Sequence, residues 1–363
     1  MIFFAWLIII FTFVQMLVSL TNLLIEPNIP ESENSSSDLV SVLIPARNEE
    51  NNIGNILSDL INQDHRNIEI IVFNDQSEDR TAEIVMEFAM NDNRIRLIES
   101  DGLPSDWLGK NYACHKLSQN ATGRYLLFLD ADVRIINRLI DNAVFFARKH
   151  NTGLISIFPK QIIVSLGEKI TVPNMNYILV SLLPLILVRK SRFPSLAAAN
   201  GQFMFFRSDV YRNTLPHELM KNNMIEDIAT AREFKKRGIK IACLLGDDKI
   251  TCRMYKGFPD AVNGFSKNVI GFFGGSFIMA LIFWLITSFG FAVILFTLPP
   301  VFFYVYVILY LLTRIFVSDA SGQNIFLNIL FIIPLQASLC IFIYRAFVNK
   351  NFRKFQWKGR NIG

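Results

Sequence analysis

Residues 125–132, YLLFLDAD, join an apolar run to two carboxylates that are separated by one alanine. The five apolar or aromatic residues that open the stretch predict a buried β-strand. A carboxylate beside a buried strand is costly unless it is paired, so Asp130 and Asp132 require a cation. Side chains two apart on an extended strand point the same way, and we therefore expect both carboxylates to face one divalent ion. The alternative is a turn at the strand end with solvated acids.

Long uncharged segments flank the polar part of the chain. Hydrophobic residues make up 52% of the 363 residues, and residues 1–25 carry no charged side chain. A further 46 uncharged residues separate Lys267 from Arg314, and another long apolar run follows at 315–344. Because a membrane-spanning helix needs about 20 apolar residues, we predict a multi-pass protein of the cell membrane. Residues 1–25 are alternatively a signal peptide, but no basic segment precedes them.

Strands and helices alternate between these segments. The stretches LVSVLIP, IEIIVFND, IRLIE and RYLLFLDAD are typical of strands, and NIGNILSDLINQ, TAEIVMEFAM and NYACHKLSQNAT are typical of helices. Ser77 is the expected N-cap of the second helix. The alternation predicts an α/β fold with a mostly parallel, Rossmann-like sheet and helices on both faces. The expected organisation is a membrane anchor at 1–27, a linker at 28–38, a cytoplasmic α/β domain at 39–267, transmembrane or interfacial helices at 268–345 and a basic cytoplasmic tail at 346–363.

Polar residues cluster where the predicted strands end. PARNEE at 45–50 follows the first strand, and Asp75 ends the second. In a parallel sheet, ligands gather at the carboxyl ends of the strands, so these residues and the acids of the DAD sequence should form one rim. Such a rim suits a sugar nucleotide, because acids and amides bind base and ribose while a divalent metal neutralises the diphosphate.

These ordered motifs resemble a known family. SVLIPARNEE, IIVFNDQSEDRTAEI and GKNYACHKLSQNATGRYLLFLDADV, within residues 39–135, are similar to the nucleotide-sugar-binding half of family 2 glycosyltransferases, which have the GT-A fold. The resemblance implies a nucleotide-sugar donor, expected to be UDP-linked, and a Mg²⁺ or Mn²⁺ ion held by Asp130 and Asp132. Lys110 is implied to lie near the donor, although a surface lysine before a helix is the alternative. The implied nucleotide-sugar-binding residues are Pro45, Ala46, Arg47, Asn48, Glu49, Asp75, Lys110 and Asp130.

The stretch MIEDIATAREFKKRG at 224–238 predicts a helix with two acids in its first turn. Acids at this position complement the helix dipole, which alone would explain them. In the family that the sequence resembles, an E-D pair at this point supplies the catalytic base. The resemblance therefore implies that Asp227, beside Glu226, takes the proton from an acceptor hydroxyl. No second acid is placed as a covalent nucleophile, so we expect a single displacement with inversion at the anomeric carbon.

Two further segments resemble acceptor-side elements of the family. Gln202 lies in AAANGQFMFFRSDVY (197–211), and Trp357 and Arg360 lie in the tail sequence FQWKGR. A cation and an indole together suit a diphosphate and an apolar or sugar ring. A juxtamembrane basic patch that binds anionic lipid is the alternative for the tail.

The basic tail raises a conflict over topology. The positive-inside rule places the tail in the cytoplasm, and a domain that uses cytoplasmic sugar nucleotides must lie there too. An even number of crossings should separate them, yet three apolar segments follow the domain, at 272–297, 299–316 and 325–344. Either one of the three is interfacial or re-entrant, or the tail lies outside. The apolar run within 176–190 is too short to span, and we favour an interfacial helix over a core helix there.

The combined pattern predicts a membrane-bound hexosyltransferase that moves a sugar from a nucleotide donor onto a lipid-embedded acceptor by metal-assisted inverting displacement. GKNYAC, RMYKGF and WKGR are most similar to the branch of the family that acts on carotenoid acids and hopanoid-type lipids. A processive polysaccharide synthase and a catalytically silent membrane scaffold stay open as alternatives. Nucleic acid is not an expected partner, because the excess positive charge clusters beside the membrane.

Overall fold

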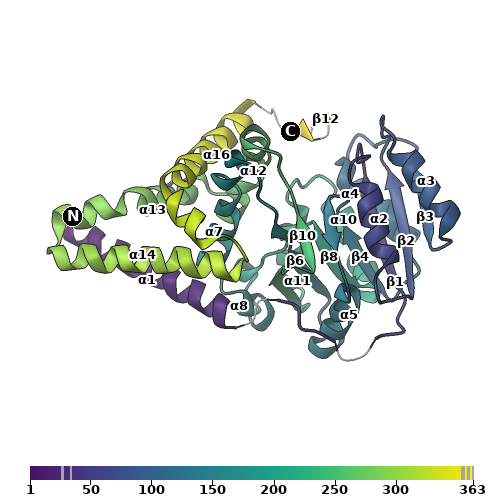
Figure 1. Cartoon of the computed structure of the whole chain (residues 1–363), viewed down its shortest axis with the longest axis horizontal. Coiled ribbons are helices and arrows are strands. Elements are labelled where there is room, and N and C mark those ends of the chain that lie inside the picture. Colours follow the sequence, from purple (N-terminus) through teal and green to yellow (C-terminus); the bar gives the residue numbers. More distant parts are fainter. Residues whose placement is uncertain (26–27, 33–34, 353–355, 358–359, 362–363) are drawn as a thin grey trace.

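The computed structural model describes the chain except for residues 26–27, 33–34, 353–355, 358–359 and 362–363, and from residue 351 onward it describes the backbone alone. Figure 1 shows an α/β domain at one end and a group of long helices that projects from it at the other. The N-terminus lies at the far end of these helices, whereas the C-terminal strands lie on the side of the domain.

A seven-stranded sheet forms the centre of the domain. β8 is antiparallel to its neighbours β4 and β6, and the other adjacent strands run parallel. This arrangement confirms the expected fold class. Val40 pairs with both Ile68 and Tyr125, so β2, β1 and β4 run side by side and end at one edge. In spatial order the strands are β3 (Ile95–Glu99), β2 (Ile68–Asn74), β1 (Val40–Ala46), β4 (Tyr125–Leu129), β8 (Phe203–Arg207), β6 (Leu154–Phe158) and β9 (Ile241–Leu245).

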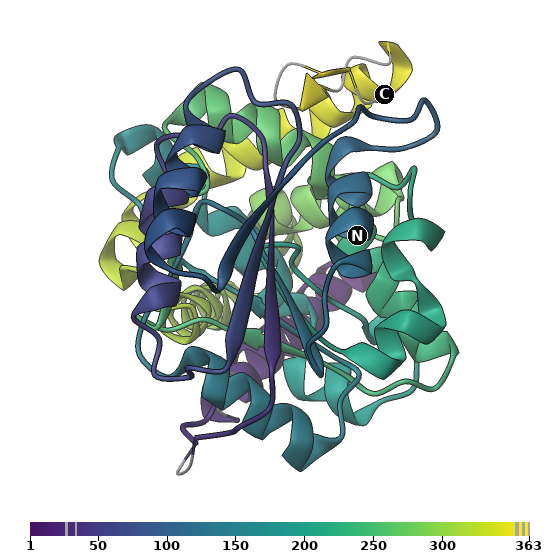
Figure 2. The ribbon, with the colours of Figure 1, turned by 90° about the vertical axis from the view of Figure 1, so that its right-hand side faces the viewer.

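Helices cover both faces of this sheet (Figure 2). Successive side chains of a strand point to opposite faces. On β1, Val42 and Ile44 therefore belong to the core cluster that includes residues of α2, α3 and α5, whereas Leu43 belongs to the cluster that includes residues of α4, α11 and α12. Burial on both faces explains why the strand sequences are almost continuously apolar. The helices of the domain are α2 (Ile53–Ile61), α3 (Thr81–Asn91), α4 (Gly109–Gln119), α5 (Leu139–His150), α6 (Leu166–Lys169), η1 (Pro194–Leu196), α9 (Ser208–Thr214), α10 (Pro216–Leu219), α11 (Glu226–Lys236) and α12 (Phe258–Phe272).

A three-stranded sheet lies against the carboxyl edge of the main one. β10 (Ile250–Cys252) pairs antiparallel with β5 (Val133–Ile135) and parallel with β7 (Lys160–Gln161). β5 starts directly after the DAD sequence, so the small sheet fixes the position of the segment that follows β4. Its pairing places Cys252 opposite Val133, next to Asp132.

Four described helices are long and apolar enough to cross a membrane, judged by length and composition. α1 packs against α13 and α14 through a small core that contains Ala5, Ile8, Ile294 and Tyr306. These three helices form the projecting group in Figure 1. The apolar segments predicted from the sequence are therefore helices. The four are α1 (Ile2–Leu24), α13 (Phe277–Thr297), α14 (Pro300–Ala320) and α16 (Ile332–Phe352), with the short α15 (Ile325–Leu330) before the last.

α16 does not follow the direction of α13 and α14. It runs steeply across them in Figure 1 and packs along α12. α14 returns to the domain. Gly322, just after this helix, lies so close to Lys160 of β7 that a Cβ added to the glycine would be 3.1 Å from Cε of the lysine. The later part of α16 lies beside the start of α13, with the rings of Phe347 and Phe277 5.6 Å apart. The chain thus leaves α14 and approaches the tail on the same side, which supports an interfacial or re-entrant α16.

The segment expected to lie in the membrane interface divides at Pro184 into α7 (Pro173–Leu182) and α8 (Leu185–Lys190). α7 is buried between α1 and α14, and the guanidinium of Arg314 stacks 3.5 Å above the ring of Tyr177. The expectation of an interfacial helix is therefore wrong for α7, which is a core helix. Its polar residues explain this, since Asn174 donates hydrogen bonds to Leu335 and Ser338 of α16.

Candidate active site

The ends of β1, β2 and β4 meet at one edge of the sheet, as the sequence predicts. Ala46 pairs with Asn74, and the N–H of Asp75 donates to the carbonyl of Ala46 at 2.8 Å. Asp130 follows β4, the other neighbour of β1. The residues expected to bind the nucleotide sugar from 45–49 and 75 are thus placed beside Asp130.

The loops after β1 and β2 hold each other. Arg47 is buried, and its Nη1 donates to the carbonyls of Asp75 at 2.6 Å and Gln76 at 3.0 Å. Asn48 and Gln76 have φ angles of 53° and 55°, the left-handed region that non-glycine residues rarely adopt. Such backbone conformations concentrate at functional sites because the surroundings must enforce them. In this structure Arg47 therefore organises the loop that would meet the nucleotide.

Ser77 does not cap α3, contrary to expectation. The helix begins four residues later, at Thr81, and the Ser77 hydroxyl instead accepts from the N–H of Asn48 at 3.0 Å. The Thr81 hydroxyl accepts from the N–H of Glu49 at 2.8 Å. Both hydroxyls thus accept hydrogen bonds from the loop after β1. A capping pattern in the local sequence does not reveal partners that are so distant along the chain.

The DAD sequence forms a turn rather than an extended strand. β4 ends at Leu129, and the N–H of Val133 donates to the carbonyl of Asp130 at 3.2 Å. The expectation of an extended strand through Asp130 and Asp132 is therefore wrong, because the chain turns before it enters β5, and the expectation that both carboxylates face one ion stays a prediction. The acids are nevertheless not fully solvated: both are partly buried, and Asp132 hydrogen-bonds Cys252.

Asp132 has the properties of a cation ligand. Burial and the charges of Asp130 and Glu49 raise its pKa to about 7, and its Oδ1 is buried without a hydrogen-bond partner among the described residues. In the described part of the chain, no three His, Cys, Asp or Glu side chains group so as to hold a metal by themselves. One or two carboxylates plus substrate phosphates are the usual Mg²⁺ site. The residues therefore fit a divalent ion that is bound together with a diphosphate.

Lys110 joins the first half of the domain to the second. Its Nζ lies 2.7 Å from Oδ1 of Asp130 and 3.9 Å from Oε1 of Glu226, and it donates to the carbonyl of Gly201 at 3.3 Å. Burial opposes the charge of Lys110, but the two acids outweigh it and raise the pKa above its ordinary value. With 25% of its side chain exposed and these partners, Lys110 is not a freely solvated surface lysine.

The two acids at the start of α11 are held differently. The carboxylate of Asp227 accepts from the N–H of Gly201 at 2.9 Å and from that of Ile228 at 2.7 Å. Burial raises the pKa of Glu226 to about 7, opposed by Lys110 and assisted by the charge of Asp227. Burial also raises the pKa of Asp227. A carboxylate with its pKa near neutrality is suited to accept and return a proton at physiological pH.

These side chains open onto one cavity of about 200 Å³, which we call the acidic cavity. Gln202 lines this cavity, and its Nε2 donates to Sγ of Cys252 at 3.0 Å. Lys267 and Asn268 of α12 also line the cavity but lie in no motif, so sequence reasoning missed them. Burial lowers the pKa of Lys267. The lining residues are Lys110, Asp130, Asn200, Gly201, Gln202, Met224, Ile225, Glu226, Asp227, Met254, Lys267 and Asn268.

The predicted tail element forms a small hairpin. β11 (Gln356–Trp357) pairs antiparallel with β12 (Arg360–Asn361), and Trp357 lies opposite Arg360. The side chains of both residues lie outside what the structure describes, so their assignment to the acceptor or diphosphate stays a prediction.

Comparisons with known proteins agree with this geometry. Residues 41–215 match the family model of Glycosyl transferase family 2. The chain is 29% identical over 240 residues to 4,4'-diaponeurosporenoate glycosyltransferase of Staphylococcus haemolyticus (strain JCSC1435), covering 65% of this chain but only 62% of that protein. It is 26% identical over 268 residues to the protein of that name from Staphylococcus aureus (strain USA300), covering 70% of this chain and 68% of the relative.

Among solved structures, the mannosyltransferase PcManGT from Pyrobaculum calidifontis in complex with GDP-Man and Mn²⁺ superposes with a TM-score of 0.55. The superposition covers 97% of this chain and 99% of the other at 16% sequence identity, which shows a shared fold. Residues 41–215 are therefore similar to a glycosyltransferase family 2 domain, and the chain has a GT-A-like α/β fold.

Proposed function

We propose that this chain is a membrane-bound glycosyltransferase that moves a sugar from a nucleotide donor onto a lipid-embedded acceptor by inverting displacement. The acidic cavity carries the proposal, because it joins Lys110 and Asp130 of the nucleotide-sugar half to Glu226 and Asp227 of the other half. The four apolar helices support a membrane location, and the use of sugar nucleotides supports a cytoplasmic domain.

On the donor side, the loops after β1 and β2 would hold the nucleotide. Pro45 to Glu49 and Asp75 would contact base and ribose, and Asp132, assisted by Asp130, would hold Mg²⁺ or Mn²⁺ together with the diphosphate. The metal would supply positive charge that stabilises the departing diphosphate. Lys110 is placed to balance the carboxylates beside it. UDP is the expected nucleotide, and the GDP-Man bound by the mannosyltransferase makes GDP the alternative.

On the acceptor side, Asp227 would act as the base. Two backbone N–H groups fix its carboxylate, which leaves further lone pairs to take the proton of an attacking hydroxyl. The oxygen–anomeric carbon bond forms as the bond to the diphosphate breaks on the opposite face, which inverts the anomeric centre. Gln202 borders the same cavity and would contact the acceptor.

The acceptor class is supported by the relatives, whose name specifies a carotenoid acid. A carboxylic acid is already ionised at neutral pH and needs no base, whereas a hydroxyl on a hopanoid or another lipid does. Comparing wild type with Asp227→Asn on acceptors of both kinds therefore separates them. A variant that keeps its activity on carboxylates and loses it on hydroxyls would assign the base role.

The direct test is a transfer assay on the full-length chain in lipid nanodiscs with Mn²⁺, lipid extract, and UDP-glucose, UDP-N-acetylglucosamine or GDP-mannose. Mass spectrometry of the lipids should detect the gain of one sugar from one donor. Asp132→Asn should lose Mn²⁺-dependent donor binding, while Asp209→Asn on the outer helix α9 should keep it. Repeated addition would favour a polysaccharide synthase. Failure to bind or consume any donor would favour the silent scaffold.

A further inference from the structure

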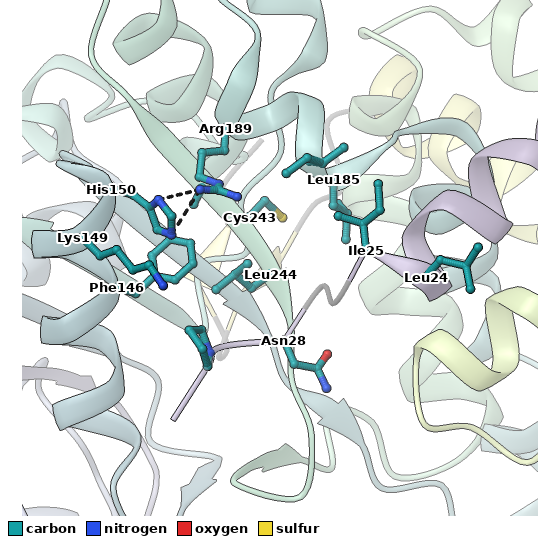
Figure 3. Close-up of a pocket in the computed structure, with 13 residues that line it drawn as sticks. Leu24, Ile25, Asn28, Phe146, Lys149, His150, Leu185, Arg189, Cys243 and Leu244 are labelled. Carbon is teal, nitrogen blue, oxygen red and sulfur yellow. Dashed lines mark hydrogen bonds between the residues drawn. The ribbon is translucent and has the colours of Figure 1, made fainter. Parts of the chain in front are cut away.

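A second and larger cavity lies between the end of α1 and the edge strand β9 (Figure 3). It has a volume of about 520 Å³ and shares no lining residue with the acidic cavity. We call it the basic cavity. Its lining residues are Leu24, Ile25, Asn28, Pro30, Phe146, Lys149, His150, Leu185, Ile186, Arg189, Ala242, Cys243 and Leu244.

Hydrogen bonds fix the basic cavity at the membrane end of the domain. The Asn22 side chain, in the last turn of α1, donates to the carbonyls of Val180 at 2.8 Å and Leu183 at 2.9 Å. Its Oδ1 accepts from the N–H of Leu185 at 2.8 Å. These bonds attach an apolar helix of membrane-spanning length to α7 and α8. The cavity therefore lies where such a helix would leave the bilayer.

One wall of the basic cavity is cationic. Nη1 of Arg189 lies 2.6 Å from Nδ1 of His150, and the guanidinium stacks 5.6 Å from the centre of the Phe146 ring (Figure 3). Since a guanidinium only donates, His150 accepts and is neutral. Burial and the charges of Arg189 and Lys149 lower the pKa of His150. The described lining contains no carboxylate that would neutralise these cations.

The wall on the side of the membrane helices is apolar. Leu24 and Ile25 at the end of α1 are 69% and 49% exposed, and Leu185 and Ile186 of α8 border the same space. A cationic wall beside an apolar one matches an amphiphile with an anionic head. A soluble anion would contact only the cationic wall and would leave the apolar wall without a partner.

We propose that the basic cavity binds the headgroup of an anionic phospholipid, with the phosphate on Arg189 and Lys149 and the first acyl carbons against Leu24 and Ile25. Anionic lipids of the cytoplasmic leaflet attract basic residues near the membrane surface. The basic cavity shares no lining residue with the acidic cavity, and the inference rests on the membrane location in the proposed function but not on its chemistry. It assigns the lipid a structural place between the membrane helices and the sheet edge.

The test uses full-length protein, delipidated in detergent, and native mass spectrometry with dioleoylphosphatidylglycerol or dioleoylphosphatidylcholine. We expect wild type to bind the anionic lipid at least tenfold more tightly. The double variant K149Q/R189Q should lose this preference. The matched control K190Q/K236Q removes two exposed charges that do not line the cavity and should keep it. Equal loss of the lipid preference in both double variants would overturn the proposal, because the preference would then depend on the net charge of the protein and not on the cavity.

Two further outcomes would also overturn it. Displacement of the lipid by millimolar glycerol 3-phosphate would show a site for a soluble phosphate. Glu26, next to Ile25 in the sequence, provides the other comparison. If lipid is the normal occupant, E26Q should leave the preference unchanged; a tenfold gain in lipid affinity would show that the chain neutralises the cations itself.

Discussion

The two cavities of this molecule differ in how the charges of their lining side chains are balanced. In the acidic cavity, three carboxylates and two lysines converge from separate segments, and most of them have fixed partners such as the Lys110–Asp130 pair and the N–H of Gly201 on Asp227. In the basic cavity, Arg189 and Lys149 face an open space without a carboxylate in the described lining. Buried charges are costly unless paired. The first cavity therefore carries its own counter-charges, whereas the described lining of the second offers cations to an anion from outside, the occupant proposed above.

The largest expected effect comes from Asp227→Asn. If the acidic cavity is a reaction centre, removing the base should reduce kcat on a hydroxyl acceptor roughly a thousandfold, within the range of general-base catalysis. Donor affinity should stay within about twofold, because the amide keeps the shape of the side chain. Steady-state kinetics and donor titration measure the two quantities. Glu233→Gln, on the same helix but paired with Arg237 at the surface, is the matched control. Near-normal turnover of the Asp227→Asn variant would show that Asp227 is not the base.

Lys110→Met should have the next largest effect, a ten- to hundredfold loss of kcat/KM, because it leaves Asp130 without its ion-pair partner. The pH profile gives a sharper readout. A base works deprotonated, and burial raises the pKa of Asp227, so wild-type activity on a hydroxyl acceptor should rise with pH as this carboxyl loses its proton. Lys110 lowers the pKa of both Asp227 and Glu226, so its removal should move this rise to higher pH. An unchanged pH profile would show that neither Glu226 nor Asp227 controls the rate of the reaction.

The candidate active site could be assembled from sequence to a large extent because its residues sit in ordered local patterns. Strand-to-loop transitions located Glu49, Asp75 and Asp130, and an acidic helix start located Asp227. What failed were statements about local conformation: the DAD sequence turns where a strand was expected, and the Ser77 hydroxyl accepts from the N–H of Asn48 instead of capping α3. Those conformations depend on contacts with neighbouring loops and with β10, which lie far away in the sequence.

The basic cavity could not be predicted at all. Leu24, Lys149, Arg189 and Cys243 come from four segments separated by dozens of residues, and none belongs to a recognisable motif. For the same reason Lys267 was missed in the acidic cavity. The error for α7 is related: an apolar run of a dozen residues looks alike in a core and at an interface, and only its contacts with α1 and α14 decide.

Gly201→Ala should have a smaller effect on the acidic cavity. A Cβ at this position would lie 3.1 Å from Nζ of Lys110 and 3.2 Å from Oε1 of Glu226, so both side chains would have to shift. We expect about a tenfold lower kcat, since small misplacements of reacting groups are costly. The thermal unfolding temperature should change little, because long side chains can yield. Gly54→Ala, whose Cβ would meet its neighbours at ordinary distances, is the control. Equal activity of both variants would show that the cavity tolerates added volume.

The smallest perturbation tests whether both cavities serve the same side of the membrane. α13 and α14 form a hairpin that returns to the domain, and α16 approaches the start of α13. The tail should therefore share the compartment of the domain. Lys358 lies outside the described residues, but Lys358→Cys in a Cys340→Ala background should react with an impermeant maleimide in inverted vesicles and not in intact cells. Pro299→Cys, between α13 and α14, should react from the other side. Labelling of Lys358→Cys in intact cells would instead make α16 a full crossing and place the tail away from both cavities.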